Sequence, residues 1–250
     1  MIFTQLIQTN LRTKELGKKV EYYNRLDSTN KEAWELIEEG QDNQHGTIVI
    51  TENQIKGKGR KENLWSMVAG KGLAISVILD KIYPANHSSF ISLATGIAVV
   101  ESLEKRGIEC SLKWPNDIYY QEKKLGGILC ESKIKKDAID KIVIGVGINV
   151  NETIEEHPDD LQKSITTMFS ITKHAHQREL IVAEFINSFE SALKKKSIRN
   201  YLDMQQGDVP ATWADASLLQ TLTGYTPNTP ISEGVKSFCD WYMSFDSNIK

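Results

Sequence analysis

Apolar and polar positions along the 250-residue chain change their spacing several times. Strict alternation and short β-branched runs predict strands, because successive side chains of a strand point to opposite faces of the sheet. Apolar positions three and four residues apart predict helices that bury one face. On these grounds we expect strands at Val20–Leu26, Thr47–Thr51, Leu73–Leu79, Cys110–Trp114, Ile118–Tyr120, Gly127–Ile134 and Lys141–Val150, and helices at Lys31–Glu39, Ser88–Arg106 and Glu179–Lys196.

The order of these elements indicates the fold class. Runs of short strands are interrupted by long helices, and the regular strand–helix alternation of a doubly wound sheet is absent. We therefore expect an α+β fold, in which a mixed, largely antiparallel sheet is packed with helices.

The composition of the chain changes near Ser197. A short helix is expected at Asp215–Leu222, and a second one follows Pro230, with Val235, Phe238, Tyr242 and Phe245 on one stripe. The period of that stripe is near 3.6, whereas strands of a small barrel would alternate. We expect two domains, residues 1–196 and residues 197–250, of which the second is a short helical tail.

Composition and charge exclude several classes of protein. The chain is 40% hydrophobic and 25% charged, with a formal net charge of −3, which does not favour a nucleic-acid binder. Its first residues contain no apolar signal segment, and no stretch approaches the ~18 apolar residues of a membrane span. Three cysteines, Cys110, Cys130 and Cys239, have neither disulfide-framework nor metal-site spacing. We expect a cytoplasmic protein in which Cys130 is a core thiol.

The loop after the second expected strand, Gln54–Lys61, combines glycines with basic side chains. Glycines let a backbone approach a ligand closely, and an arginine can hold a carboxylate or phosphate at two points. The loop lacks the spacing of a P-loop and of a dinucleotide-binding turn. When it is considered alone, the loop is better explained as a solvated basic surface loop than as a ligand-binding loop.

Two further motifs lie close together. Lys113–Asp117 (Lys-Trp-Pro-Asn-Asp) ends a strand, and its Asn and Asp can bond nearby backbone or a ligand. Lys123–Leu129 places a lysine at the start of an apolar strand, where its charge could meet a reacting anion. A common turn and an edge-protecting lysine pair are the plain structural alternatives.

The fourth motif is Gly145–Asn151, with two glycines inside a strand. Glycine weakens a strand and usually marks a bulge or a close approach of backbone. Each of the four motifs is weak evidence alone, but together their order and spacing are informative.

In that order the motifs resemble those of biotin–protein ligases over residues 20 to 195. The matching stretches are Gly57–Arg60, Lys113–Asp117, Lys124–Leu129 and Gly145–Asn149, with Ser28–Asn30 and Gln54 as further matches. The resemblance implies the fold of a class II synthetase-like catalytic domain. It also implies formation of biotinyl-5'-AMP from biotin and ATP, followed by transfer of biotin to a lysine of a biotin carrier domain.

The resemblance implies a catalytic or ligand-binding role for each residue that matches a motif of the family. It implies catalytic roles for Lys124 and Arg60 and no metal site held by the protein, with Mg²⁺ accompanying ATP. Asp117 is a candidate for the metal side of the nucleotide. Biotin contacts are implied for Ser28, Thr29, Asn30, Gln54, Gly57, Lys58, Arg60, Lys124, Gly126, Gly127 and Gly145. ATP contacts are implied for Arg60, Trp65, Lys113, Asn116, Asp117 and Asn149.

Several departures and alternatives accompany the resemblance. Lys58 stands where the family usually has arginine, and Glu62 where it often has glycine. No helix-turn-helix domain precedes the motifs, so neither a repressor role nor nucleic-acid binding is implied, and no membrane partner is expected. A homodimer is possible. A lipoate or octanoate ligase of the same fold, or a biotin-binding protein with impaired turnover, stays open.

The C-terminal segment differs most from the pattern of biotin–protein ligases. Relatives usually end in a small SH3-like barrel, whereas residues 198–245 resemble the C-terminal end of NAD-dependent nucleotide-sugar epimerases, chiefly through Gly207–Asp215. The dinucleotide-binding motif and the catalytic Tyr–Lys pair of those enzymes are missing. A fusion, a frameshift or a chimera would each explain the tail.

Overall fold

The computed structural model of the chain describes residues 1–40, 43–84, 88–135, 138–194, 215–226 and 228–246. The chain divides into two compact units, Met1–Lys196 and Ser197–Lys250. None of the described helices is long and apolar enough to cross a lipid bilayer.

The first unit contains one large sheet, a small hairpin and several helices. The strands are β1 (Val20–Tyr23), β2 (Ile48–Thr51), β3 (Gly57–Lys58), β4 (Leu64–Trp65), β5 (Leu73–Leu79), β6 (Tyr83–Pro84), β7 (Ser111–Lys113), β8 (Asp117–Tyr120), β9 (Lys123–Lys135) and β10 (Ala138–Ile148). The helices are α1 (Thr4–Asn10), α2 (Thr29–Glu38), α3 (Ser88–Glu104), α4 (Asp159–Gln162), α5 (Met168–Thr172) and α6 (Arg178–Leu193), with 3-10 turns η1 (Arg60–Glu62) and η3 (Ile154–Glu156).

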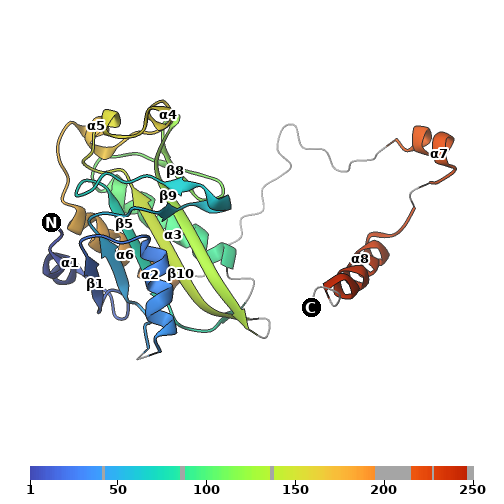
Figure 1. The fold of residues 1–250 in the computed structure, drawn as a ribbon, viewed down its shortest axis with the longest axis horizontal. Helices are drawn as coiled ribbons and strands as arrows, with labels where there is room; N and C mark the ends of the chain where they lie inside the picture. The colour runs from blue at the N-terminus through green and yellow to red at the C-terminus, as the bar shows by residue number, and fades with distance from the viewer. Residues whose placement is uncertain (41–42, 85–87, 136–137, 195–214, 227, 247–250) are drawn as a thin grey trace. The chain divides into compact units, whose positions relative to one another are not determined.

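The large sheet is mixed and largely antiparallel, which confirms the predicted fold class. Its strand order is β1-β2-β5-β10-β9-β8-β7, with β6 beside the start of β10 (Figure 1). Only the β1–β2 pair is parallel among these pairs. The β3–β4 hairpin forms a separate two-stranded sheet.

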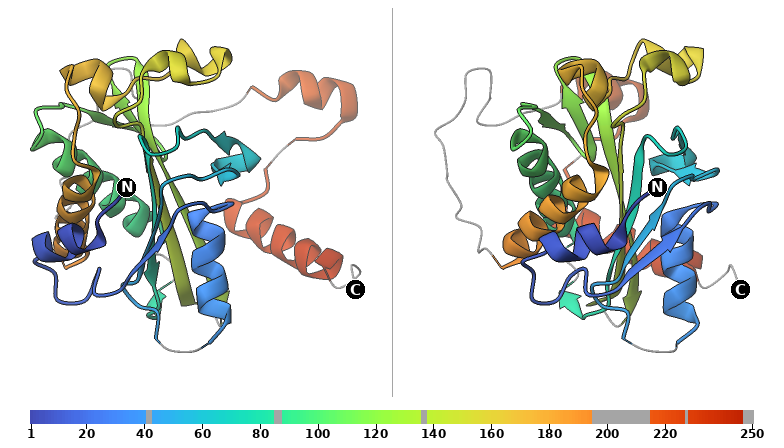
Figure 2. Two further views of the ribbon diagram at one scale, coloured as in Figure 1. Left: turned by 60° about the vertical axis from the view of Figure 1, so that its left-hand side comes forward. Right: turned by 90° about the vertical axis from the view of Figure 1, so that its left-hand side faces the viewer.

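Helices cover both faces of the sheet (Figure 2). One face packs on α2 through a small apolar cluster that includes Ala33, Val49, Ile78 and Val143. The other face packs on α3 and α6 in the main core. Because strand side chains alternate in direction, neighbours of Val143 such as Ile142 and Ile144 belong to the main core instead.

The predicted strands and helices of this unit are present, with shifted ends. Strand β9 begins at Lys123, four residues before its predicted start, so Lys124 lies within the strand. Helix α1 was not predicted, because its short polar sequence Thr4–Asn10 carries little apolar periodicity. The expected loop Gln54–Asn63 contains β3 and the turn η1, whose few residues give no periodic signal.

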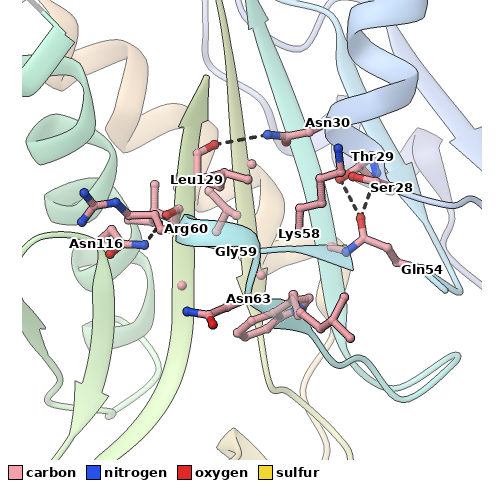
Figure 3. Close-up of a pocket in the computed structure, with 18 of the residues that line it drawn as sticks. Ser28, Thr29, Asn30, Gln54, Lys58, Gly59, Arg60, Asn63, Asn116 and Leu129 are labelled. Carbon is pink, nitrogen blue, oxygen red and sulfur yellow. Dashed lines mark hydrogen bonds between the residues drawn. The ribbon is translucent and has the colours of Figure 1, made fainter. Parts of the chain in front are cut away.

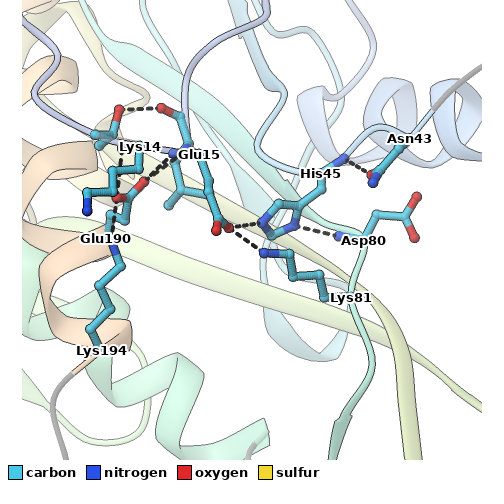
Figure 4. Close-up of polar contacts among 10 residues, drawn as sticks. Lys14, Glu15, Asn43, His45, Asp80, Lys81, Glu190 and Lys194 are labelled. Atoms are coloured by element: carbon cyan, nitrogen blue, oxygen red, sulfur yellow. Dashed lines mark hydrogen bonds and ion pairs between the residues drawn. The ribbon is translucent and has the colours of Figure 1, made fainter.

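The N-terminal segment is fastened to α6 by a buried carboxylate (Figure 4). Glu190 accepts hydrogen bonds from the backbone N–H groups of Lys14, Glu15 and Leu16, each at 2.9 Å, and from Lys194 Nζ at 2.6 Å. Burial alone would raise the pKa of Glu190, but these donors outweigh it and lower the pKa to about 2. Nearby, Glu15 Oε2 lies 3.1 Å from His45 Nε2, within hydrogen-bond distance.

The second unit contains helices α7 (Ser217–Thr223) and α8 (Ile231–Asp246) among its described residues. Both predicted helices are therefore present, and the described part of this unit contains no strand and no SH3-like barrel. Val235 and Phe238 are exposed, while the side chains of Tyr242 and Phe245 are outside the description. The motif Gly207–Asp215 lies outside the described residues except for Asp215, so the likeness to epimerases stays a prediction.

Candidate functional site

A pocket lies on the α2 face of the sheet, where three glycines of the neighbouring strands β9 and β10 line it. Gly127 of β9 pairs with Gly147 of β10, and Gly145 lies two residues earlier on the same face. A Cβ atom at Gly145 would come within 2.3 Å of Asn30 Oδ1, and one at Gly147 within 2.4 Å of the Trp65 ring. Glycine is therefore needed at both positions, because any larger residue would fill the pocket floor.

One end of the pocket lies at the N-terminus of α2 and is lined by the neutral polar side chains of Ser28, Thr29 and Gln54, toward which Lys58 of β3 extends (Figure 3). Gln54 Oε1 accepts a hydrogen bond of 2.8 Å from the backbone N–H of Thr29 and lies 3.2 Å from its hydroxyl (Figure 3). Ser28 is the N-cap residue, and its side chain makes no capping hydrogen bond. This end therefore presents a helix N-terminus and neutral donors, which suit a polar uncharged group.

Buried hydrogen bonds fix the side chains of this polar end. Ser76 Oγ lies 2.6 Å from Asn30 Oδ1 and 2.8 Å from Thr29 Oγ1. Asn30 Nδ2 donates to Glu131 Oε2 at 2.7 Å. Ser76 and Glu131 were not predicted as site residues, although Ser76 is the only polar residue of β5 and is fully buried. That isolated hydroxyl was the available signal.

The other end of the pocket is cationic. Lys124 Nζ on β9 lies 2.7 Å from Asp117 Oδ1 on the neighbouring strand β8, and both side chains are about one third exposed. Arg60 and Lys124 also line the pocket, and Asp117 is the one carboxylate among the lining residues. The third basic lining residue, Lys58, extends toward Thr29 instead (Figure 3). The excess of positive charge suits an anion.

The β3–β4 hairpin covers the pocket and carries Arg60. Gly59 N donates to Asn63 O at 2.7 Å, which closes the hairpin tip, and Lys61 inside it has a φ of 53°. Arg60 lies beside Asn116 (Figure 3). Within the described residues, no hydrogen bond or ion pair holds the Arg60 guanidinium, so it is available to a ligand.

Trp65 at the end of the hairpin packs its ring against the glycine floor. Lys124 Nζ lies 5.9 Å from the centre of that ring. The indole Nε1 is buried and has no hydrogen-bond partner. An unpaired buried donor is unfavourable, so a bound ligand that offered an acceptor there, or moved the ring, would remove this cost.

The structure brings most of the predicted site residues together. Those that line the pocket are Ser28, Thr29, Asn30, Gln54, Lys58, Arg60, Trp65, Asn116, Asp117, Lys124, Gly127 and Gly145. Four predicted residues do not line it: Gly57, Gly126, Lys113 and Asn149. Residues that line it without having been predicted include Asn63, Ala74, Leu129 and Gly147.

The four remaining residues have other surroundings. Lys113 Nζ lies 4.4 Å above the Tyr119 ring, and Asn149 is buried and donates from Nδ2 to Thr166 O at 3.0 Å. A Cβ at Gly57 would meet Trp65 O at 2.5 Å, and one at Gly126 would meet Gly147 O at 2.8 Å. These two glycines therefore allow close backbone packing around the pocket, and the ligand contacts predicted for all four stay predictions.

Neither Cys110 nor Cys130 lines the pocket. Cys130 packs against the core as predicted, and burial raises the pKa of its thiol to about 11. Burial also raises the pKa of Cys110 to about 11. Both thiols are therefore protonated at neutral pH, and the site is arranged to bind and orient anions instead.

Comparisons with known proteins identify the family and several relatives of the chain. A sequence model of the biotin/lipoate A/B protein ligase family matches residues 22–149. The bifunctional ligase/repressor BirA of Bacillus subtilis is 30% identical over 213 residues, which cover 85% of this chain and 63% of that protein. A biotin–[acetyl-CoA-carboxylase] ligase of Mycobacterium tuberculosis is 29% identical, over 59% of this chain and 54% of its own length.

The fold is also similar to a solved structure. The biotin protein ligase of Aquifex aeolicus, in complex with biotin and ATP, superposes with a TM-score of 0.59 at 30% identity and covers 71% of each chain. The present chain spans less than two thirds of the Bacillus and Mycobacterium proteins.

Proposed function

The chain belongs to the biotin/lipoate A/B protein ligase family, and from this membership we propose that it is an ATP-dependent biotin–protein ligase. In the proposed reaction, a carboxylate oxygen of biotin attacks the α-phosphorus of ATP, and pyrophosphate leaves with its bridging oxygen. The amine of a lysine on a biotin carrier domain then attacks the acyl carbon of biotinyl-5'-AMP. AMP leaves with the electron pair of the broken C–O bond, and the amine proton passes to solvent.

The division of the pocket into two ends supports this proposal most strongly. Biotin has an uncharged ureido ring at one end and a carboxylate at the other. The neutral end at Ser28, Thr29 and Gln54 matches the ring, and the cationic end at Arg60 and Lys124 matches the carboxylate. The glycine floor between them leaves room for the saturated sulfur ring and the aliphatic chain that join these two groups in biotin.

Lys124 has the proposed catalytic role. The first step brings two anions together, so the site must supply positive charge where they meet. The ion pair with Asp117 and the position above Gly127 hold the Lys124 ammonium at the cationic end before any ligand arrives. Preorganisation of this kind stabilises the transition state without reorganisation during the reaction.

Arg60 has the proposed role of retaining the adenylate. Its guanidinium has no partner within the described residues, and the hairpin that carries it has few contacts to the sheet. A guanidinium can hold a phosphate by two hydrogen bonds, which would close the hairpin over the intermediate.

Mg²⁺ would enter with ATP as the substrate complex. The described residues contain no group of three His, Cys, Asp or Glu that could hold a metal ion. Asp117 is the pocket carboxylate nearest to this role, and its partner Lys124 would then turn to the reacting anions. The supply of ATP also favours a cytoplasmic reaction.

The same pocket argues against a lipoate or octanoate substrate. Those acids carry apolar ends, which would exclude water from the polar side chains of Ser28, Thr29 and Gln54 without offering them a hydrogen bond. Biotin's ureido group can pair with them. We therefore favour biotin over the two alternative acids.

The proposal is tested by incubating the protein with biotin, MgATP and a biotin carrier domain and detecting label with streptavidin. We expect labelling of one carrier lysine that requires both biotin and ATP, and that is lost in Lys124→Met. Labelling that persists without ATP, or that is equal in Lys124→Met, would contradict the proposal.

A further inference from the structure

Trp114 is a large aromatic side chain at the surface beside the pocket. It belongs to the turn Lys113–Asp117, whose Asn116 and Asp117 line the pocket. Trp114 itself does not line it and is 76% exposed. Exposed apolar patches of this kind on soluble proteins usually mark a binding surface.

Trp114 forms one wall of an apolar groove. Helix α3 contributes Ser92 and Leu93 to the lining of this groove, and β7 contributes Leu112. Leu93, Leu112 and the neighbouring Ile97 are each more than one third exposed. Gly96 makes room for the groove, because a Cβ at that position would lie 2.8 Å from Leu112 Cδ2.

The groove is continuous with the pocket. Asn116 and Ile128 line both, and Asn116 Nδ2 is fixed by a hydrogen bond of 2.7 Å to Ile128 O. Strand β7 pairs only with β8 among the described strands, so the outer edge of the sheet borders the groove. A partner seated there would lie next to the mouth of the pocket.

We propose that this groove, between Trp114 and α3, docks the acyl-acceptor protein during the second step. The inference rests on the proposed function. An acceptor lysine must reach the acyl carbon at the cationic end, and its parent domain must therefore rest on a surface that borders that end. The apolar lining selects a domain that carries an apolar side chain close to its acceptor lysine. A second copy of this chain in the groove would present no such amine.

The test separates docking from chemistry. Trp114→Ala and Leu93→Asp each alter the lining of the groove, and Leu93 lies outside the motif turn. Ile82→Ala is the matched control, since Ile82 is 77% exposed and precedes β6, which pairs with the opposite end of β10 from the pocket. Three rates are measured for each variant: biotin-dependent pyrophosphate release, transfer of biotin to hydroxylamine, and transfer to a purified biotin carrier domain.

We expect both groove variants to raise the KM for the carrier domain and to leave the other two rates unchanged. For Trp114→Ala the rise should be about 30-fold, or on the order of 2 kcal/mol, as for a central aromatic contact of an interface. Ile82→Ala should behave as the parent. The hydroxylamine reaction needs no docking, so it reports an intact site.

Two results would overturn the docking proposal. One is an unchanged KM for the carrier in both groove variants. The other is a change in oligomeric state by sedimentation with an unchanged carrier KM, which would assign the groove to a second copy. A parent protein that releases no pyrophosphate would instead refute the proposed function itself, so the two failures are distinguishable.

Discussion

Replacing Lys124 by methionine should slow adenylate formation much more than it weakens biotin binding. Methionine keeps most of the side chain's length but removes the charge that faces the reacting anions. Two unit charges about 4 Å apart near a protein surface interact by about 4 kcal/mol. At about 1.4 kcal/mol per factor of ten, this corresponds to roughly a thousandfold slower activation. The freed carboxylate of Asp117, now without its partner at 2.7 Å, would add repulsion.

Isothermal calorimetry of biotin binding and pyrophosphate exchange should be measured in parallel on the same preparation. Biotin affinity should fall by less than about tenfold, because the charge acts mainly as the two anions meet. Lys123→Met is the matched control, since Lys123 is the adjacent residue of β9 and does not line the pocket. Equal losses in binding and exchange would show that Lys124 is a binding or structural residue, and the reasoning would be refuted.

Three further predictions follow from named contacts. Arg60→Gly should keep pyrophosphate release but let biotinyl-5'-AMP escape, so bulk lysines of added protein become labelled; labelling no greater than the parent's would exclude a retaining role. Glu190→Gln should lower the free energy of unfolding by about 2 kcal/mol at pH 7. Because the folded pKa of Glu190 is about 2 and its ordinary value 4.5, this difference should be full above pH 4.5 and shrink as the pH falls towards 2; a pH-independent difference would contradict it. Truncation after Lys196 should leave the biotin affinity unchanged, as measured by calorimetry. If the truncated protein lost ATP binding that the full chain has, residues 197–250 would perform the role that the SH3-like barrel has in relatives.

The fold was predictable from the sequence where spacing carried information. The β-branched runs of β2 and β5 and the apolar helix α3 gave strong periodic signals, and their order indicated the mixed sheet. Helix α1 and the β3–β4 hairpin were missed, because seven polar-rich residues and two-residue strands carry no usable period.

The candidate site was predictable only in part. Motif spacing indicated Lys124, Arg60 and the glycines, since these residue types are informative without coordinates. The roles of Ser76 and Glu131 depend on strand register, which places them beside Asn30 although they are 46 and 101 residues away along the chain. Lys113 belongs to the most specific motif, yet it lies over Tyr119 and does not line the pocket, because β7 is the outermost strand, beyond β8, and stands farther from the glycine floor on β9 and β10.

The measurement closest to the central claim is release of pyrophosphate from MgATP with each candidate acid supplied alone, combined with mass spectrometry of the product. The account predicts that biotin supports release and yields one biotinyl-5'-AMP per site, which remains bound until an acceptor amine is added. Lipoate and octanoate should support little release, because their apolar ends would exclude water from the polar side chains of Ser28, Thr29 and Gln54 without offering them a hydrogen bond. Release with lipoate or octanoate but not with biotin would contradict the account.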